Sequence, residues 1–342
     1  MRAMVLNELC CLEENQTPLT LTTLPDPVPG AREILVKVSV CGVCHTELDE
    51  IEGRTPPPYL PVVLGHQIVG RVEAKGNQVS LFHIGDRVGI AWIGSACGIC
   101  KFCLSGNENL CFDFKATGRD VNGGYAEYMT VSEAFAHPLS EVFSDVEASP
   151  ILCAGAIGYR SLKLTNLQDG QNLGLIGFGA SAHLVLKMVR YRHPNAKVFI
   201  FARSAAERAF AKELGADWTG DLGEESPEKR DSIIDTTPVW KPVVEALKNL
   251  TSGGRLVINA IRKEEVYKES LLTLHYPAHL WMEKEIKSVA NVARSDVKEF
   301  FALAAEISIK PEVQEFKLEE ANQTLIELKM RKIRGAKVLK IE

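Results

Sequence analysis

The sequence predicts an α/β protein of two domains, in which a doubly wound parallel sheet is joined to a second domain rich in β-strands. Three observations support this fold class. The chain of 342 residues is longer than one ordinary hydrophobic core requires. Residues 171–217 alternate apolar runs with a glycine turn and a helical stretch. Before residue 150, short apolar runs are separated by Gly and Pro turns such as Thr55-Pro56-Pro57-Pro58.

The first repeating unit of the parallel sheet begins with an apolar run at 173–176. Gly177-Phe178-Gly179 follows, then a helical stretch that ends before His193-Pro194, then a second apolar run at 198–201. Strand, glycine turn, helix and strand form the unit that binds dinucleotides, known as the Rossmann unit. Gly177 permits the tight turn, and Gly179 lets a pyrophosphate approach the backbone. The amides at the start of the helix, at Ala180 and Ser181, then face the negative charge.

Further apolar runs continue this pattern at 232–235, 256–260 and 286–290. The helical stretch 239–254 lies between two of them and ends on a predicted stop signal, Gly253-Gly254. We therefore expect a parallel-sheet domain at 151–290. Residues 1–150 and 291–342 are expected to form the β-rich domain, closed by the returning carboxy-terminal segment.

Composition and charge exclude several classes of protein. Apolar residues make up 46% of the chain, charged residues 24%, and the net charge is −5. We find no apolar run long enough to span a membrane and no leader pattern at the amino terminus, so we expect a cytoplasmic protein without a membrane partner. The basic stretch 329–340 is interleaved with apolar residues. We interpret it as the solvated face of a terminal strand and expect no nucleic-acid partner.

Four of the nine cysteines lie within fifteen positions, in the pattern CxxCxxCx7C. A cytoplasmic location keeps thiols reduced, so a disulfide framework is disfavoured. Two-residue gaps let several thiolates converge on one ion, and four sulfur ligands make a closed tetrahedral zinc site. The alternative, four buried free cysteines, requires them to cluster by chance. The predicted structural zinc ligands are Cys97, Cys100, Cys103 and Cys111.

Three other residues suggest a second metal site, at which chemistry can occur. Cys44, His66 and Cys153 together offer two sulfurs and one nitrogen, which leaves one coordination position of a zinc ion open. Taken singly, each has a structural interpretation, because a lone histidine or a cysteine in an apolar run is more often part of the core.

The chain as a whole resembles the zinc-dependent alcohol dehydrogenases of the medium-chain dehydrogenase/reductase superfamily. The matching segments are GVCHTEL, PVVLGHQIVGRV, GDRVGIAWIGSACGICKFC, GGYAEYMTV and LCAGAIGYRSL. This resemblance implies that the β-rich domain is GroES-like and holds both zinc ions, catalytic at Cys44, His66 and Cys153 and structural at the four-cysteine cluster. It further implies reversible hydride transfer between an alcohol and a nicotinamide cofactor, and a homodimer or homotetramer.

The end of the second strand determines which nicotinamide cofactor fits. A carboxylate there would bind the ribose hydroxyls of NAD, but the position falls on Ala202, followed by Arg203 and Ser204. The Arg203 guanidinium can pair with a 2′-phosphate. We therefore expect NADP(H) in preference to NAD(H). The alternative is that Arg203 only stacks on adenine and either cofactor binds.

The resemblance also suggests roles for residues around the catalytic zinc. Thr46 matches the hydroxyl that starts the proton relay, and Asp49 stands where relatives place its distal histidine. The glutamate of the usual GHE motif is Gln67 here. His45, Arg334 and Lys337 are the candidates for contacting the pyrophosphate. Trp92 aligns with an aromatic residue of the substrate pocket, although a buried core tryptophan explains it equally well.

Two other functions remain open at this stage. One is a related medium-chain reductase of another substrate class, such as activated double bonds, whose members commonly lack the three catalytic ligands. The other is a catalytically silent protein that keeps the fold, made conceivable by Asp49 and Gln67.

Overall fold

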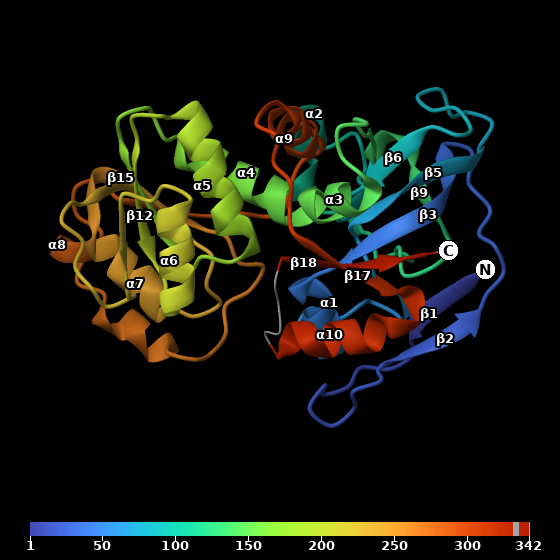
Figure 1. Cartoon of the computed structure of the whole chain (residues 1–342), viewed down its shortest axis with the longest axis horizontal. Coiled ribbons are helices and arrows are strands. Elements are labelled where there is room, and N and C mark those ends of the chain that lie inside the picture. Colours follow the sequence, from blue (N-terminus) through green and yellow to red (C-terminus); the bar gives the residue numbers. More distant parts are fainter. Residues whose placement is uncertain (331–334, 342) are drawn as a thin grey trace. The chain divides into compact units, whose positions relative to one another are not determined.

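A computed structural model describes residues 1–330 and 335–341 and divides the chain into two compact units. Unit 1 comprises Met1–Cys153 and Ala293–Glu342, and unit 2 comprises Ala154–Val292. In Figure 1, unit 1 is coloured from blue to green and includes the red carboxy-terminal segment, whereas unit 2 is coloured from green through yellow to orange.

Unit 2 is a parallel α/β domain built on one sheet. Within residues 154–292, all of which the structure describes, six strands run in the order β13-β12-β11-β14-β15-β16, and every pairing is parallel. This is the strand order of a dinucleotide-binding domain and confirms the expected Rossmann fold. The strands are β11 (Asn172–Ile176), β12 (Lys197–Phe201), β13 (Trp218–Gly220), β14 (Arg230–Asp235), β15 (Leu250–Ile258) and β16 (Glu285–Ser288).

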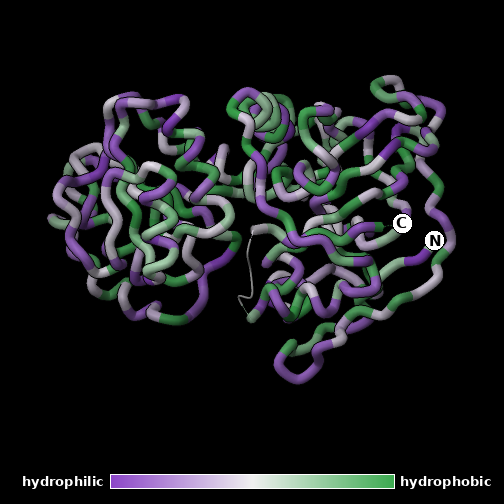
Figure 2. Tube along the Cα trace, in the orientation of Figure 1, coloured by the Kyte–Doolittle hydropathy of each residue, from purple (hydrophilic) through white to green (hydrophobic). Residues whose placement is uncertain are grey.

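Helices pack beside this sheet because crossovers between parallel strands place them on its faces (Figure 1). They are α4 (Ala156–Thr165), α5 (Ala180–Arg192), α6 (Ala205–Glu213), α7 (Lys241–Lys248) and α8 (Tyr276–His279). The central strands β11 and β12 are almost wholly buried, in keeping with their continuous apolar runs. Figure 2 shows these hydrophobic segments in green, within more hydrophilic loops.

The helix at 239–254 is shorter than the sequence predicts. It ends at Lys248, and Gly253-Gly254 lie inside β15 rather than at a helix end. Apolar spacing continues from the helix into the strand, so periodicity alone did not mark the boundary. Asn249 closes the helix instead, and Leu250, fully buried, begins the strand.

Unit 1 is rich in β-structure. Within its described residues, one sheet has seven strands in the order β10-β6-β5-β3-β18-β17, with β9 also paired to β3; a second has the order β2-β1-β4, and β7 pairs with β8. The strands are β1 (Arg2–Leu6), β2 (Leu19–Thr23), β3 (Glu33–Val43), β4 (Val62–Val63), β5 (Ile68–Lys75), β6 (Arg87–Ile90), β7 (Ile93–Ser95), β8 (Lys115–Ala116), β9 (Tyr128–Ser132), β10 (Ala136–Pro138), β17 (Val313–Lys317) and β18 (Ala336–Lys340).

Short helices connect these strands, and two longer ones come from the carboxy-terminal part of the chain. They are α1 (His45–Ile51), α2 (Lys101–Leu104), α3 (Asp145–Pro150), α9 (Arg294–Glu306) and α10 (Ala321–Lys329). One continuous apolar core lies between the sheets and α10, from Ala3 on β1 to Leu339 on β18.

The terminal strand expected within 329–340 is present as β18, but the expectation that its face is solvated was wrong. β18 lies inside the large sheet, paired antiparallel to β3 and parallel to β17. Val338 and Leu339 are fully buried, and the Lys337 ammonium is enclosed beside Glu327 (2.6 Å) and Gln314 (3.1 Å). This leaves Lys337 no free charge for a pyrophosphate, and Arg334 lies outside the described residues.

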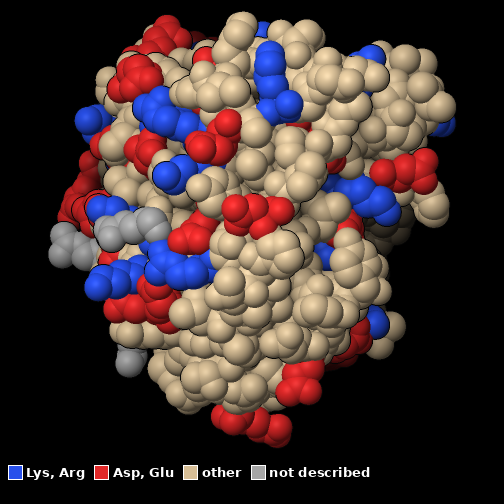
Figure 3. Space-filling view, turned by 90° about the vertical axis from the view of Figure 1, so that its right-hand side faces the viewer, with Lys and Arg blue, Asp and Glu red and all other residues tan. Residues whose placement is uncertain are grey.

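Charge on the visible face of the molecule is mixed. Figure 3 shows blue and red side chains interspersed there rather than gathered by sign. Among the residues that the structure describes, no helix is both long enough and apolar enough to cross a bilayer.

Candidate functional site

The structure brings together Cys44, His66 and Cys153, three residues that are far apart in the sequence. Their ligand atoms all lie within 4.8 Å of one another in unit 1. Cys44 is the residue that precedes α1, His66 follows Gly65, and Cys153 lies in the π-helical turn Ile151–Gly155. Gly65 has a φ of 98°, and a β-carbon there would lie 2.5 Å from the Tyr125 ring. Only glycine therefore fits before His66.

The spacing of the sulfur atoms fits a tetrahedral zinc ion. A zinc–sulfur distance of about 2.3 Å places two sulfur ligands roughly 3.8 Å apart along the edge of a tetrahedron. The Cys44 and Cys153 Sγ atoms are 3.9 Å apart. One nitrogen and two sulfurs form the donor set of a zinc site with a fourth position open for substrate or water.

Glu47 connects two of these residues, and sequence analysis did not single it out. Its Oε1 lies 2.7 Å from His66 Nδ1, and its Oε2 accepts a hydrogen bond of 2.8 Å from the Cys44 backbone amide. The His66 ring is thereby held with Nε2 directed away from Glu47. The spacing Cys-x-x-Glu at the start of a helix, the position of a capping-box glutamate, was the available signal.

The electrostatic environment favours a thiolate at Cys44. A hydrogen bond from Cys153 brings the pKa of Cys44 well below the ordinary thiol value despite burial, and raises the pKa of Cys153 well above it. Burial disfavours a charged His66, but the charges of Glu47 and Cys44 outweigh it and raise the pKa of His66. One of the two thiols is thus prepared to act as a metal ligand.

The predicted relay residues lie on α1 in different surroundings. The Thr46 hydroxyl lies 3.6 Å from Cys44 Sγ, and its side chain is half-buried. Asp49 is buried and accepts a hydrogen bond of 2.6 Å from Arg54 Nε. His45 is exposed. Gln67 is buried, and its side chain packs so closely against Gly42 that a β-carbon there would lie 2.7 Å from Gln67 Oε1.

The four-cysteine group forms a separate lobe of unit 1 between β7 and β8. The four sulfur atoms lie within 4.8 Å of one another, with Cys97 Sγ 3.9 Å from Cys103 and 3.5 Å from Cys111. Backbone amides of Ile99 and Cys100 lower the pKa of Cys97 to about 7. Four sulfurs at tetrahedral spacing match a closed zinc site with no position for substrate.

The nucleotide turn of unit 2 has the predicted backbone. Gly177 has a φ of 79°, and a β-carbon there would lie 2.6 Å from Thr236 Oγ1. Gly179 precedes α5 with open space where a side chain would stand. Ala180 at the helix start is exposed, whereas Phe178 is buried against Phe210. The turn therefore exposes the amides of the helix start and offers them to an anion.

Ser181 has a packing contact at this helix start. Its hydroxyl donates to the Ala154 carbonyl (3.0 Å), and a β-carbon on Gly158 would lie 2.9 Å from Ser181 Oγ. Only its backbone amide therefore remains for a ligand. Ala182, the small third position of the motif, is 1% exposed, as close helix packing requires.

The end of β12 carries two guanidinium groups. Ala202 is buried, Arg203 is exposed, and Ser204 accepts a hydrogen bond from Glu207 at the start of α6. Arg208, which sequence analysis missed, donates to the Ala202 and Arg203 carbonyls at 2.7 and 2.9 Å. Its place in the first turn of the helix after the predicted ribose position was the available signal.

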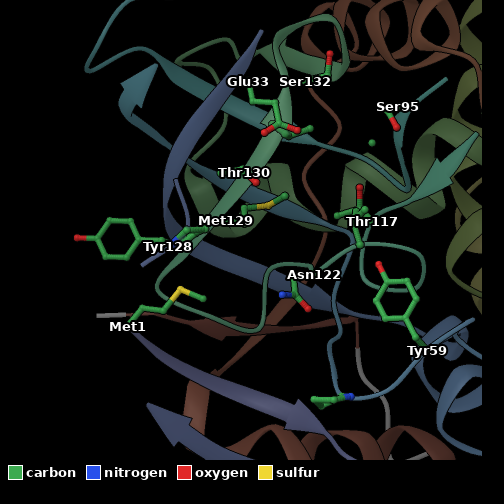
Figure 4. A pocket seen from close by; sticks show the side chains of 15 residues that line it. Met1, Glu33, Tyr59, Ser95, Thr117, Asn122, Tyr128, Met129, Thr130 and Ser132 are labelled. Carbon is green, nitrogen blue, oxygen red and sulfur yellow. The ribbon is translucent and has the colours of Figure 1, made fainter. Parts of the chain in front are cut away.

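Trp92 lies in the core of unit 1. It is 6% exposed, packs against Phe114 (ring centroids 5.3 Å apart) and lies under the Arg119 guanidinium. Its indole nitrogen has no hydrogen-bond partner among the described residues. A hollow of about 270 Å³ opens elsewhere on unit 1 (Figure 4), where the labelled Tyr59, Thr117 and Asn122 gather. Its lining contains none of the three residues Cys44, His66 and Cys153.

Comparison with known proteins identifies the family. Residues 30–141 match the family described as "Alcohol dehydrogenase GroES-like domain". The chain is 41% identical to "Probable alcohol dehydrogenase AdhA" of Mycobacterium tuberculosis, over 95% of this chain and 93% of that protein. It is 32% identical to an alcohol dehydrogenase of Geobacillus stearothermophilus, over 97% of this chain and 98% of that protein.

A solved structure gives the same result. The acetophenone reductase of Geotrichum candidum, determined in complex with NAD, superposes with a TM-score of 0.85 at 25% identity, covering 99% of this chain and 96% of that one. The chain belongs to the zinc-type alcohol dehydrogenase family of the medium-chain dehydrogenase/reductase superfamily.

Proposed function

We propose that the chain catalyses reversible hydride transfer between a primary or secondary alcohol and a nicotinamide cofactor, with one catalytic and one structural zinc ion. The observation that carries this proposal is the convergence of Cys44, His66 and Cys153 at tetrahedral spacing with one position open. Action on alcohols follows from the family.

The chain's own residues have distinct tasks in this reaction. When bound, the zinc ion supplies Lewis-acid polarisation of the substrate oxygen and the nicotinamide ring accepts or donates the hydride. Cys44, His66 and Cys153 hold the metal, and Glu47 fixes the ring of His66 and the backbone of Cys44. Outer partners of this kind orient the ligands and increase metal affinity.

Thr46 is the residue proposed to move the substrate proton. Its Oγ1, 3.6 Å from a ligand sulfur, can accept the alcohol proton while passing on its own. Asp49 lies on the same helix but is bound by Arg54, so its carboxylate is available to the relay only if that ion pair loosens. Trp92 is proposed to form one wall of the substrate pocket, because its buried indole face is apolar.

NADP(H) is the proposed cofactor. No carboxylate stands at the end of β12, and the exposed Arg203 and the neighbouring Arg208 place positive charge there. Gly177, Gly179 and the amides of Ala180 and Ser181 are proposed to contact the pyrophosphate, with His45 as a further contact. NAD(H), the ligand of the Geotrichum relative, is the alternative.

We also propose a homodimer or homotetramer in the cytoplasm. β16 is an edge strand whose four residues are all exposed, and Trp281 (54%) and Leu272 (90%) precede it. Exposed apolar residues beside an unpaired strand edge favour association of two sheets.

Hydride transfer itself provides the test. Purified protein is assayed by nicotinamide absorbance with a panel of aldehydes and ketones and with NADPH and NADH in parallel. Turnover with both bound metals present supports the proposal, and preference for NADPH supports the role of Arg203. Reduction of activated double bonds instead would favour the alternative reductase, and absence of turnover with every substrate would favour a silent family member.

A further inference from the structure

Glu50 differs from the other buried carboxylates of unit 1. It is fully buried on α1, and neither of its carboxylate oxygens has a hydrogen-bond partner among the described residues. Glu108, by contrast, binds Arg294, and Glu133 accepts from the amides of Ser80 and Leu81. A buried carboxylate without partners destabilises a fold, so its presence requires a compensating function.

The charged groups around Glu50 belong largely to the catalytic metal site. Cys44 and Glu47 act on it as negative charges, and His66 and Arg119 as positive ones. Burial, followed by the charge of Glu47, raises the pKa of Glu50 well above the usual carboxyl range. A carboxylate at this position therefore needs additional positive charge nearby in order to be ionised.

Glu50 is not placed to be a fourth ligand. The group of ligand atoms that lie within 4.8 Å of one another comprises Cys44, His66 and Cys153 and does not include Glu50. Any effect of Glu50 on the metal is therefore electrostatic and acts across the helix that begins at Cys44. Such an effect is strong in a buried region, where charges are poorly screened.

We propose that Glu50 is a positioning residue for the catalytic metal, a buried negative charge that retains the cation in the Cys44–His66–Cys153 site at the expense of the stability of the metal-free protein. This inference rests on the proposed function. Release of a divalent cation would leave the buried Glu50 carboxylate, which has no hydrogen-bond partner among the described residues, without the positive charge that its ionisation requires, and this makes release unfavourable.

The test measures zinc release from the purified full-length protein into a chromogenic chelator. The release phase of the catalytic ion is the one that parallels loss of activity and is missing in Cys44→Ser. Glu50→Gln keeps the size of the side chain and removes its charge. We expect this phase to become about tenfold faster, as for other outer-shell partners. The phase of the four-cysteine site should be unchanged.

A matched control separates this role from packing. Glu133→Gln changes a buried carboxylate that has backbone partners, so it should lower the urea midpoint and leave both release phases unchanged. Metal-depleted Glu50→Gln should have a urea midpoint equal to or higher than that of the metal-depleted parent, because a buried carboxyl group without hydrogen-bond partners is replaced by a neutral amide of the same size.

The outcomes distinguish this inference from the proposed function. Unchanged catalytic-ion release in Glu50→Gln, or a lower urea midpoint with both phases altered together, would overturn the inference and leave the enzyme assignment intact. A parent protein that binds no metal at Cys44, His66 and Cys153 would overturn the proposed function itself.

Discussion

The two metal-type groups of unit 1 differ in how the chain assembles them. The four cysteines at 97–111 come from one continuous lobe, whereas Cys44, His66 and Cys153 come from three distant segments. Each group has a buried carboxylate nearby, but the Glu108 carboxylate in the four-cysteine lobe is paired with Arg294, whereas the Glu50 carboxylate beside the second group has no hydrogen-bond partner among the described residues. A local cluster closes a loop around an ion, while a group assembled by the fold can leave one position open and surround it with tuned charges.

The largest expected effect is a loss of turnover that occurs only when the group Cys44, His66 and Cys153 is altered. Cys44→Ser removes a ligand of the open site, so turnover should fall by roughly a thousandfold or more, since Lewis-acid stabilisation contributes several kcal/mol to the barrier. Nicotinamide absorbance measures the loss, and circular dichroism should show an unchanged fold. Cys11→Ser, at an exposed cysteine outside both groups, is the control and should keep full activity. If Cys44→Ser keeps more than a tenth of the parental turnover, the group Cys44, His66 and Cys153 is not the catalytic metal site.

The second effect concerns the other group and appears as stability. Cys100→Ser breaks the four-sulfur site, and a structural zinc site contributes directly to folding. The thermal midpoint should fall by more than about 5 °C, because several kcal/mol shift a chain of this size by that much. The protein that remains folded should still turn over substrate. If Cys100→Ser kept the parental thermal midpoint but lost activity, the four-cysteine group would be the catalytic site and not the structural one.

Cofactor preference should change without any effect on either metal. Arg203→Ala removes a guanidinium from the end of β12, and a charge-assisted bond of this kind contributes about 1.5–3 kcal/mol. The ratio of kcat/KM for NADPH over NADH should drop about 10- to 100-fold. Lys212 is an exposed basic residue on α6, so Lys212→Ala serves as the control for loss of a surface positive charge. An unchanged ratio would mean that Arg203 does not contact a 2′-phosphate.

Loss of the Glu47 carboxylate should weaken zinc affinity at Cys44, His66 and Cys153 and leave the affinity of the four-cysteine group unchanged. Glu47→Gln weakens the support of His66 and Cys44, and loss of such a partner typically costs 10- to 100-fold in metal affinity. Competition with a zinc indicator should show the weaker affinity at one site and the parental affinity at the other. Equal weakening of both sites would indicate a general loss of structure.

The smallest expected effect is a pH dependence of the free energy of unfolding, which comes from one of the two buried histidines His66 and His137. His66 is held by the Glu47 carboxylate, whereas burial and the nearby charge of Arg294 lower the pKa of His137 to about 4, with the charge of Glu108 opposing them only in part. The unfolded-state pKa of His137 is near 6.5, so below pH 6.5 the unfolded chain gains a proton that the folded chain does not. The free energy of unfolding should therefore decrease by about 1 kcal/mol between pH 6.5 and 5.5. Urea titrations of His137→Gln should lack this slope, and a persistent slope would assign it to other groups.

Local patterns were sufficient to predict unit 2 and one metal group. The apolar runs, Gly177 and Gly179 predicted the parallel sheet, and the spacing of Cys97 to Cys111 predicted their cluster. β18 was misjudged because its neighbours, β3 and β17, are decided by long-range pairing that periodicity does not encode. The partners of Glu47 and the burial of Glu50 depend on the fold in the same way.

Zinc content of the parent and of two variants tests the central claim most directly. Elemental analysis of the purified full-length protein should give two zinc ions per chain, falling to one in Cys44→Ser and to one in Cys100→Ser, with activity lost in the first and stability lost in the second. One zinc ion in the parent, or two retained in Cys44→Ser, would contradict the account of two independent sites.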